Sequence, residues 1–289
     1  MKPPKFSYHA PLLLDEVVQL LVCYQGNARL LAGGQSLVPM LNFRLLSPQA
    51  LIDLRKLPGL SDITLAQDTL CIGAMTRQRA LEDAPLVAQH LPLLRAALGW
   101  VGHLPTRSRG TIGGSLAHAD PSAELPMSLL ALDGEVVAHG PTGERRIAAV
   151  DLFQSLFSTA LQPDEVLCQI RIPVMRPGAG WAVEEYSRRR GDFAIVAVAV
   201  VLEGKTVQCS KARIAVAGVG GCALRLPSVE QYLQQHGLSE PALSQAAQLA
   251  AAAVQPLSDP VASADYRRHL TGSLLQRALQ QAVQRMVQH

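Results

Sequence analysis

The spacing of apolar residues predicts a small α/β unit at the start of the chain. In residues 11–27 apolar side chains recur at helical spacing, with Asp15 and Glu16 in the first turn and Gly26 as a stop, which predicts a helix. Residues 28–34 and 50–54 predict short strands, and the first of these enters a pair of glycines. Residues 62–75 predict a hairpin.

Further along, helical and strand patterns continue on both sides of a linker. Helical spacing over 80–102 is interrupted by Pro85 and Pro92. Residues 123–153 predict a helix or an apolar layer and then a hairpin, and 165–174 predict a strand. The Pro- and Gly-rich segment 175–180 marks a boundary. Beyond it, 192–204 and 211–221 predict antiparallel strands, and 240–254 and 263–287 predict helices. We therefore expect one domain over 1–175 and a second over 180–289.

Composition narrows the class of protein. The chain has 289 residues, of which 48% are hydrophobic and 17% charged, as in a globular protein with a large core. The net charge of +3 is spread without a basic block, so we expect no nucleic-acid partner. No secretory signal follows Met1, and the longest β-type apolar run, 194–202, is far shorter than the ~20 residues of a membrane helix. We expect a cytoplasmic protein without a membrane span.

The five cysteines are too far apart to form a metal or iron–sulfur site. No two of Cys23, Cys71, Cys168, Cys209 and Cys222 form a CxxC pair. Iron–sulfur clusters and structural zinc both need closely spaced ligands, and an odd number of thiols argues against a disulfide framework. Any redox chemistry of this chain therefore requires an organic cofactor.

Two glycine pairs indicate an anionic ligand. Gly33 and Gly34 lie in LLAGGQSLVPMLNFRL (30–45), and Gly113 and Gly114 lie in RGTIGGSLAHADPSAEL (109–125). Glycine tolerates positive φ and has no Cβ, so backbone N–H groups in such segments can converge on phosphate oxygens. Two distant segments of one chemical type predict two bends that close on one diphosphate.

Neither glycine pair belongs to a common nucleotide motif. No GxGxxG follows a predicted strand, and GxxxxGK[ST] is absent. Each pair taken alone is also compatible with a simple tight turn. The third glycine-rich stretch, residues 217–226, lacks polar companions and predicts a turn at a strand end.

The two segments that contain the glycine pairs resemble the sequence of a known family. AGGQSLVPMLNFRL followed by TIGGSLAHADPSAELP is similar to the FAD-binding medium subunit of molybdenum hydroxylases, the carbon monoxide dehydrogenase and xanthine dehydrogenase relatives. The likeness continues through EEYSRRRGDFAIVAVAV (184–200), VAGVGG and ASADYRRHL (262–270), so it spans nearly the whole chain. It implies an α+β fold. A two-subdomain FAD-binding domain of the PCMH or vanillyl-alcohol-oxidase type (about 1–56 and 57–175) is followed by a C-terminal α+β domain with a small antiparallel sheet and helices.

The resemblance also implies which residues hold non-covalent FAD. The two segments would bind the pyrophosphate and ribityl region, Val101 and Leu161 would line the cofactor, and Glu124 would lie near the adenosine ribose or the end of the second segment. The full set is Leu31, Ala32, Gly33, Gly34, Gln35, Ser36, Leu37, Val101, Thr111, Ile112, Gly113, Gly114, Ser115, His118, Glu124 and Leu161.

Several polar residues near these motifs have alternative interpretations. His118 is a candidate for flavin contact, but His118 and Asp120 also fit a tight loop in which Asp120 caps a helix that begins near Pro121. Glu184 falls where xanthine dehydrogenase-like members have a lysine near the cofactor, and a carboxylate cannot replace a cation. Tyr186 and Asp192 lie in a motif that faces either the isoalloxazine or a partner.

The resemblance places the remaining redox centres on other chains. A large subunit would carry molybdopterin, a small subunit would carry two [2Fe–2S] clusters, and FAD on this chain would pass electrons to an external acceptor (NAD⁺, a quinone or oxygen), in a dimer of heterotrimers. We find no catalytic triad and expect no catalytic side chain or metal here. Two alternatives remain: a stand-alone flavin oxidase or dehydrogenase, and a non-catalytic scaffold whose glycine pairs are only turns.

Overall fold

The N-terminal unit is a three-stranded parallel sheet covered by a helix. The computed structural model describes residues 2–205 and 207–287, so residues 1, 206, 288 and 289 of the predicted domains lie outside it. The sheet order is β1 (Ser7–His9), β3 (Ala50–Asp53), β2 (Ala28–Leu31). Helix α1 (Leu14–Tyr24) is capped by Gln25, which has a φ of 48° in the left-handed region and directly precedes Gly26. The short, mostly exposed β1 has no hydrophobic pattern, and the sequence analysis missed it.

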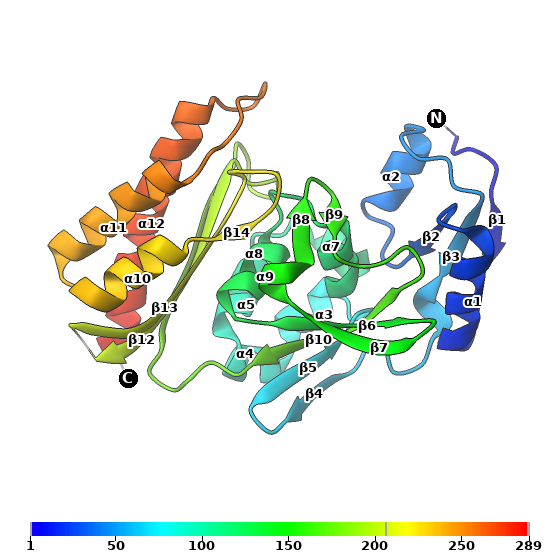
Figure 1. Cartoon of the computed structure of the whole chain (residues 1–289), viewed down its shortest axis with the longest axis horizontal. Helices are drawn as coiled ribbons and strands as arrows, with labels where there is room; N and C mark the ends of the chain where they lie inside the picture. The colour runs from blue at the N-terminus through cyan, green and yellow to red at the C-terminus, as the bar shows by residue number, and fades with distance from the viewer. Residues whose placement is uncertain (1, 206, 288–289) are drawn as a thin grey trace.

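A second subdomain is built on a five-stranded antiparallel sheet (Figure 1). Its order is β4 (Ile63–Ala66), β5 (Thr69–Gly73), β10 (Val166–Pro173), β6 (Glu135–Gly140), β7 (Gly143–Ala148). Pro85 and Pro92 each occupy the first turn of a new helix, because a proline nitrogen needs no hydrogen-bond partner there. The predicted helix over 80–102 is therefore three short ones: α3 (Gln78–Asp83), α4 (Pro85–His90) and α5 (Pro92–Leu98).

Shorter elements complete these two subdomains. They are α2 (Leu37–Asn42), the 3-10 helix η1 (Leu54–Lys56), α6 (Leu104–Arg109), α7 (Ile112–His118), α8 (Glu124–Ala131), α9 (Ala149–Leu152), β8 (Phe153–Ser155) and β9 (Ser158–Thr159). Helices α5, α7 and α8 contribute Leu94, Leu116 and Leu125 to the largest hydrophobic core, which also receives side chains from the next domain.

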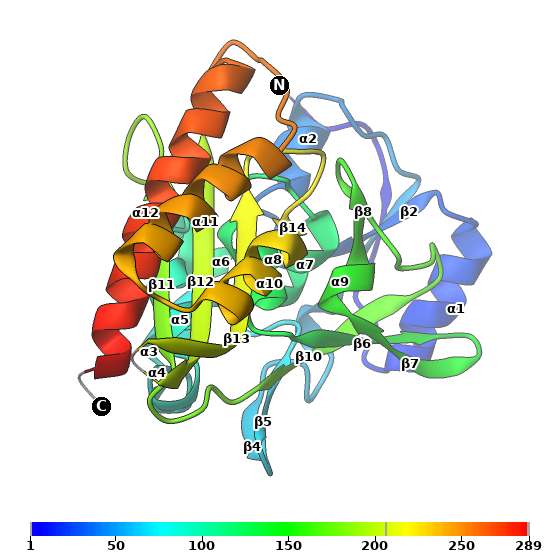
Figure 2. The same cartoon turned by 60° about the vertical axis from the view of Figure 1, so that its left-hand side comes forward.

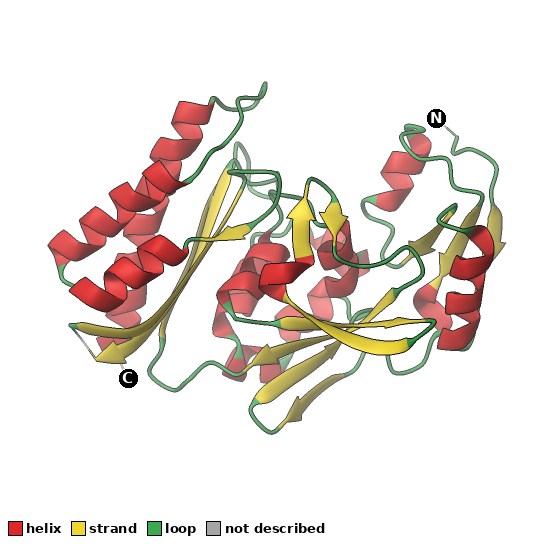
Figure 3. Ribbon diagram, in the orientation of Figure 1, coloured by secondary structure: helices red, strands yellow, loops and turns green. Residues whose placement is uncertain are grey.

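The C-terminal domain is a four-stranded antiparallel sheet covered on one face by its own helices, and helices of the first domain lie against the other face (Figures 2 and 3). The strands are β11 (Gly180–Tyr186), β12 (Val196–Lys205), β13 (Gln208–Ala217) and β14 (Leu224–Arg225), and the helices are α10 (Pro227–His236), α11 (Glu240–Ala253) and α12 (Ala264–Val287). Residues 196–202 are apolar at every position because α12 covers one face of β12 and α8 covers the other. Helix α10 was missed by the sequence analysis.

The architecture confirms the predicted α+β class with a small antiparallel sheet and helices at the C-terminal end. Among the described residues, no helix is both long and apolar enough to cross a bilayer.

Candidate functional site

The first glycine segment leaves the parallel sheet at the end of β2. Gly34 has a φ of +73°, a conformation that favours glycine, and it turns the chain into α2. The side-chain amide of Gln35 donates to the Gly33 carbonyl at 3.3 Å. Ser36 occupies the N-cap position of α2, which starts at Leu37. Ligands of α/β sheets bind beyond the carboxyl ends of parallel strands, and this segment lies at that edge.

The sequence analysis predicted a bend at the second glycine segment. In the structure this segment is the first turn of helix α7, so that prediction is wrong. Thr111 is the N-cap of α7, and its hydroxyl accepts a hydrogen bond from the Gly114 amide at 3.1 Å. A Cβ on Gly113 would lie 2.5 Å from the Ala74 Cβ, so glycine is required for α7 to pack against the chain after β5.

The two segments touch each other. A Cβ on Gly33 would collide with the Arg109 carbonyl oxygen and lie 2.8 Å from the Gly110 Cα, and one on Gly114 would lie 3.6 Å from the Ala32 Cβ. Part of the glycine requirement is therefore backbone packing between the subdomains. The two glycine segments therefore lie in contact, as the sequence analysis predicted. A bound diphosphate would lie along the line where Gly33 contacts Gly110.

Arg77, Arg109 and Arg55 are near one another beside this contact, and the sequence analysis did not assign them a role. Arg77 donates to the Arg109 carbonyl, and Arg55 pairs with Asp53 at 2.7 Å. Burial and then the charges of Arg109 and Arg55 lower the pKa of Arg77. Within 2–205 and 207–287, no carboxylate forms an ion pair with Arg77 or Arg109. Arg109 opens the second glycine segment, but its role and those of Arg55 and Arg77 depend on contacts between distant parts of the chain.

Two buried polar atoms beside the second segment have no hydrogen-bond partner. They are the Thr76 hydroxyl oxygen and the Gln78 side-chain oxygen. The backbones of both residues bond to this segment, Gln78 N–H to the Gly110 carbonyl and Ile112 N–H to the Thr76 carbonyl. Unpartnered buried polar atoms are rare in native proteins and are often completed by a ligand. The Thr76 hydroxyl can donate to an anion, so together with the surplus cationic charge it fits a group such as the diphosphate of FAD. The Gln78 oxygen can only accept and needs a donor instead.

Three other predicted residues, Leu31, Leu161 and Val101, lie in different parts of the first domain. Leu31 lies against Gly34, since its Cδ1 would be 3.4 Å from a Cβ placed there. Leu161 follows β9, which packs against α7, the helix that also contains Ser115. Val101 follows α5, and its carbonyl accepts from Arg107 of α6, the helix that leads into the second glycine segment, at 2.9 Å.

His118 is the last residue of α7 and packs against Phe157, with the ring centroids 4.9 Å apart and the planes tilted by 31°. Burial lowers its pKa, and the charge of Asp120 opposes this shift. The predicted capping role of Asp120 is wrong. Helix α8 begins at Glu124 with Ala123 as N-cap, and Asp120 instead accepts from the Ser122 amide at 2.9 Å to close a turn.

Two glutamates that follow each other in β11 face opposite ways. Glu184 pairs with Arg277 of α12 at 2.7 Å, so its side chain points away from the first domain. Glu185 is buried on the other face, and the charge of Glu124 reaches it. Tyr186 packs edge-on against Tyr266, at 6.2 Å between centroids.

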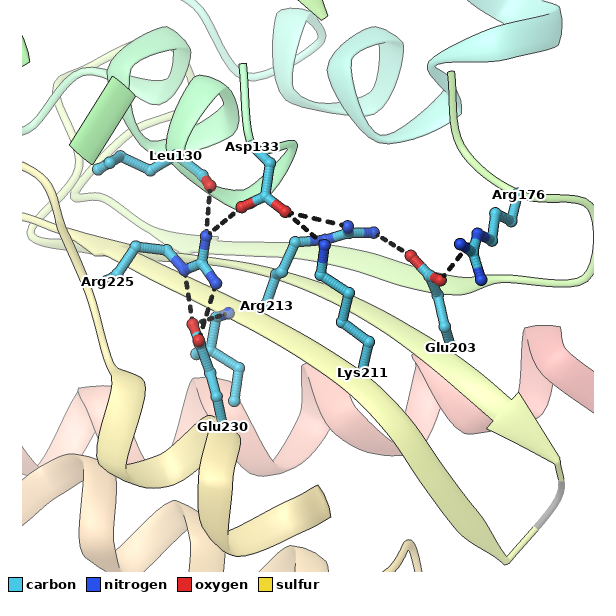
Figure 4. Close-up of polar contacts among 9 residues, drawn as sticks. Leu130, Asp133, Arg176, Glu203, Lys211, Arg213, Arg225 and Glu230 are labelled. Carbon is cyan, nitrogen blue, oxygen red and sulfur yellow. Dashed lines mark hydrogen bonds and ion pairs between the residues drawn. The ribbon is translucent and has the colours of Figure 1, made fainter. Parts of the chain in front are cut away.

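An ion network joins the two domains below α8 (Figure 4). Asp133, in the turn after α8, accepts from Arg225 at 2.7 Å, Lys211 at 2.8 Å and Arg213 at 3.2 Å. Glu230 and Glu203 complete the network from the C-terminal domain, each 2.6 Å from its arginine. The network therefore fixes β12, β13 and β14 of the C-terminal domain against the end of α8.

No group of three or more His, Cys, Asp or Glu side chains that could hold a metal ion is found in the described part of the chain. The arrangement is a cradle for an organic anion between two subdomains, with a second domain docked on it, as in a flavin-binding protein.

The comparisons agree with this class. Residues 4–175 match the model of the FAD binding domain in molybdopterin dehydrogenase, and residues 181–282 match the CO dehydrogenase flavoprotein C-terminal domain. The chain belongs to this family of flavoprotein subunits, and it is an oxidoreductase subunit with an FAD-binding domain.

Its relatives are similar along their whole length. The 6-hydroxypseudooxynicotine dehydrogenase complex subunit alpha of Paenarthrobacter nicotinovorans is 40% identical over 99% of this chain and 97% of its own. The carbon monoxide dehydrogenase medium chain of Hydrogenophaga pseudoflava is 38% identical, over 98% of both chains. A solved carbon monoxide dehydrogenase from that organism matches with a TM-score of 0.97 over 99% of both chains at 38% identity, and quinoline 2-oxidoreductase from Pseudomonas putida 86 matches at 0.93 over 98% and 99%, also at 38% identity.

Proposed function

We propose that this chain is the medium, FAD-binding subunit of a heterotrimeric molybdenum hydroxylase. In this proposal it receives electrons from [2Fe–2S] clusters on a small subunit, a large subunit carries molybdopterin, and an external acceptor is reduced at this chain. When bound, FAD supplies the chemistry that links one-electron carriers to a two-electron acceptor. The contact between the two glycine segments carries this proposal.

The chain's own residues bind and orient the cofactor. The amides after Gly33 would donate to the diphosphate, since the Gly113 and Gly114 amides already bond to the Ala74 carbonyl and the Thr111 hydroxyl. Arg77 and Arg109 would balance its charge, and the Thr76 hydroxyl would gain an acceptor. The division into domains 1–175 and 180–289, the dimer of heterotrimers and the cytoplasmic location remain predictions.

A matched pair of glycine variants tests the site. Gly34 and Gly59 both have a φ of +73°, but only Gly34 lies in the cradle, and a Cβ on Gly59 would have no neighbour within 4 Å. Ala at either position carries the same backbone strain, about 1 kcal/mol. We expect purified wild-type protein and Gly59→Ala to contain one FAD that acid denaturation releases, and Gly34→Ala to lose most of it.

The absence of FAD from the wild-type protein, or an equal FAD content in both variants, would contradict the proposal. The partner assignment is tested separately by purifying the complex from its source. We expect two iron–sulfur clusters and one molybdenum for each FAD, and FAD without either metal would favour a stand-alone flavoprotein.

A further inference from the structure

Helix α2 and the turn after it present an apolar surface that the described chain leaves exposed. Five of the six residues in α2 are apolar, but only Leu41 is fully buried. Val38 in the helix is 42% exposed, and Phe43 and Leu45 directly after it are 66% and 70% exposed. No other helix or strand of residues 2–205 and 207–287 packs extensively against α2, which stands apart from the sheet in Figure 1. We call Val38, Phe43, Arg44 and Leu45 the α2 surface.

This exposure is unusual for so short a helix. Isolated helices of fewer than about 12–15 residues are marginal in water, so a six-residue helix depends on what its apolar side chains pack against. Exposed apolar groups gathered on one short segment, with an aromatic ring and an arginine among them, are typical of a contact with another protein.

Arg44 brings a positive charge to the α2 surface from a backbone conformation that favours glycine. Its φ is 57°. The Leu45 N–H donates to the Met40 carbonyl at 2.9 Å and the Arg44 N–H to the Leu41 carbonyl at 3.0 Å, which is the Schellman motif, where this position is usually glycine. Arg44 is exposed and forms no ion pair with any described residue. An arginine retained in a strained position indicates a role for its guanidinium, which matches a carboxylate best.

The α2 surface is continuous with the proposed FAD cradle. The Val38 N–H donates to the Gly34 carbonyl at 3.0 Å, so the first turn of α2 is bonded into the first glycine segment. A Cβ on Gly34 would lie 3.2 Å from a methyl carbon of Val38. A protein seated on Val38 therefore lies next to the cofactor site. In the proposed function electrons enter FAD from iron–sulfur clusters, and their donor must dock close to the cofactor because electron transfer slows steeply with distance.

Two other occupants fit the α2 surface less well. A second copy of this chain would form a two-fold interface in which the surface faces itself, so the two Arg44 side chains would repel each other. A membrane surface is bound by amphipathic helices whose polar face is rich in Lys and Arg, whereas α2 contains neither.

We propose that the α2 surface is the docking site of the iron–sulfur subunit, with Phe43 and Leu45 in its apolar centre and Arg44 paired with a carboxylate of that subunit. This inference rests on the proposed function, which supplies the electron donor. The matching surface of the iron–sulfur subunit is apolar at its centre and acidic beside it. A few central residues carry most of the affinity of such contacts, so Phe43 and Leu45 are the residues to remove first.

Purification of the complex through a tag on the full-length chain tests the docking site, with iron and flavin per chain measured over a dilution series. Phe43→Ser/Leu45→Ser should weaken association with the iron–sulfur subunit about thirtyfold or more, which is the effect of losing one hot-spot residue. Leu12→Ser/Leu13→Ser is the matched control, because this pair lies in the same domain and is 59% and 60% exposed. It should keep the wild-type iron content.

Arg44→Gly separates docking from folding. Glycine adopts the left-handed conformation without strain, so the isolated variant should unfold at the same or a higher urea concentration than the wild-type chain. Its association with the iron–sulfur subunit should be about tenfold weaker and less sensitive to salt, because the charge pair is lost. A purely structural role of Arg44 would instead leave the affinity unchanged.

A crosslink identifies the occupant. Leu45→Cys, coupled in the intact complex through a short thiol-to-amine reagent, should be joined to a peptide of the iron–sulfur subunit, as determined by mass spectrometry. A crosslink to the large subunit or to a second copy of this chain, wild-type iron content in Phe43→Ser/Leu45→Ser, or wild-type affinity in Arg44→Gly would overturn the inference while the proposed function stands. A wild-type complex without iron would overturn the proposed function itself.

Discussion

Replacing Asp133 by asparagine should loosen the docking of the C-terminal domain on the FAD-binding domain. Asp133 has a φ of 51°, a left-handed conformation that asparagine also tolerates, so the change removes charge without straining the turn. It leaves Arg213, Arg225 and Lys211 with only Glu203 and Glu230 as acidic partners inside the network (Figure 4).

The magnitude follows from the burial of the partners. The side chains of Arg213 and Arg225 are only 10% and 14% exposed, and removing one partner of a buried ion pair costs about 3–5 kcal/mol. The side chain of Asp133 is 33% exposed, however, and asparagine still accepts one hydrogen bond. We therefore expect a loss of about 2 kcal/mol in the free energy of unfolding.

Urea unfolding followed by tryptophan fluorescence measures this loss, since Trp100 lies in the first domain and Trp181 in the second. Asp265→Asn is the control, because its partner Arg268 is three residues away and the Asp265 side chain is 93% exposed, so it should change stability by less than about 0.5 kcal/mol. If Asp133→Asn unfolds at the same urea concentration as Asp265→Asn, the network contributes no net stability and the reasoning is wrong.

The pH dependence gives an independent check. Burial raises the pKa of Asp133, but hydrogen bonds from Lys211 and Arg225 and the charges of Arg213 and Arg225 outweigh it, so the pKa lies below its usual 3.8. A depressed carboxyl pKa stabilises the folded state above the unfolded pKa, and this contribution disappears as pH falls through the folded pKa. The gap between wild-type protein and Asp133→Asn should therefore be constant near neutral pH and close below about pH 4.

Two further predictions concern the rest of the chain. Arg267→Met should destabilise the protein by about 2–4 kcal/mol in urea unfolding, because Arg267 is buried and donates to the carbonyls of Ile195 and Gly218 at 2.5 and 2.9 Å; a loss below 1 kcal/mol would contradict this. Iodoacetamide should modify Cys23 first in the native protein, because Cys23 is exposed whereas burial raises the pKa of Cys168 to about 12 and of Cys209 to about 11; mass spectrometry of the peptides checks this, and early modification of Cys168 would refute it.

Much of the fold was predictable because its signals are local. Apolar spacing identified α1, the strands β2 and β3 and the two C-terminal helices, and Pro85 and Pro92 marked the starts of α4 and α5. The misses lack such signals. Strand β1 has three residues and pairs with β3, which is more than forty positions away, and α10 follows a proline in a polar stretch. The start of α8 was misplaced because Asp120, a common capping residue, closes a turn instead.

By itself, the sequence determined the elements, the glycine pairs and the family likeness, because helical period, glycine conformation and motif order act within a few residues. Only the tertiary structure decided that Gly33 packs on Gly110, that Arg77 bonds the Arg109 carbonyl beside that contact, and that Glu185 rather than Glu184 faces Glu124. The physical reason is that burial and charge proximity depend on which distant segments meet. Glu184 and Glu185 point to opposite faces of β11 because side chains alternate along a strand. Their different surroundings arise only when the folded chain covers the two faces of the sheet with different elements.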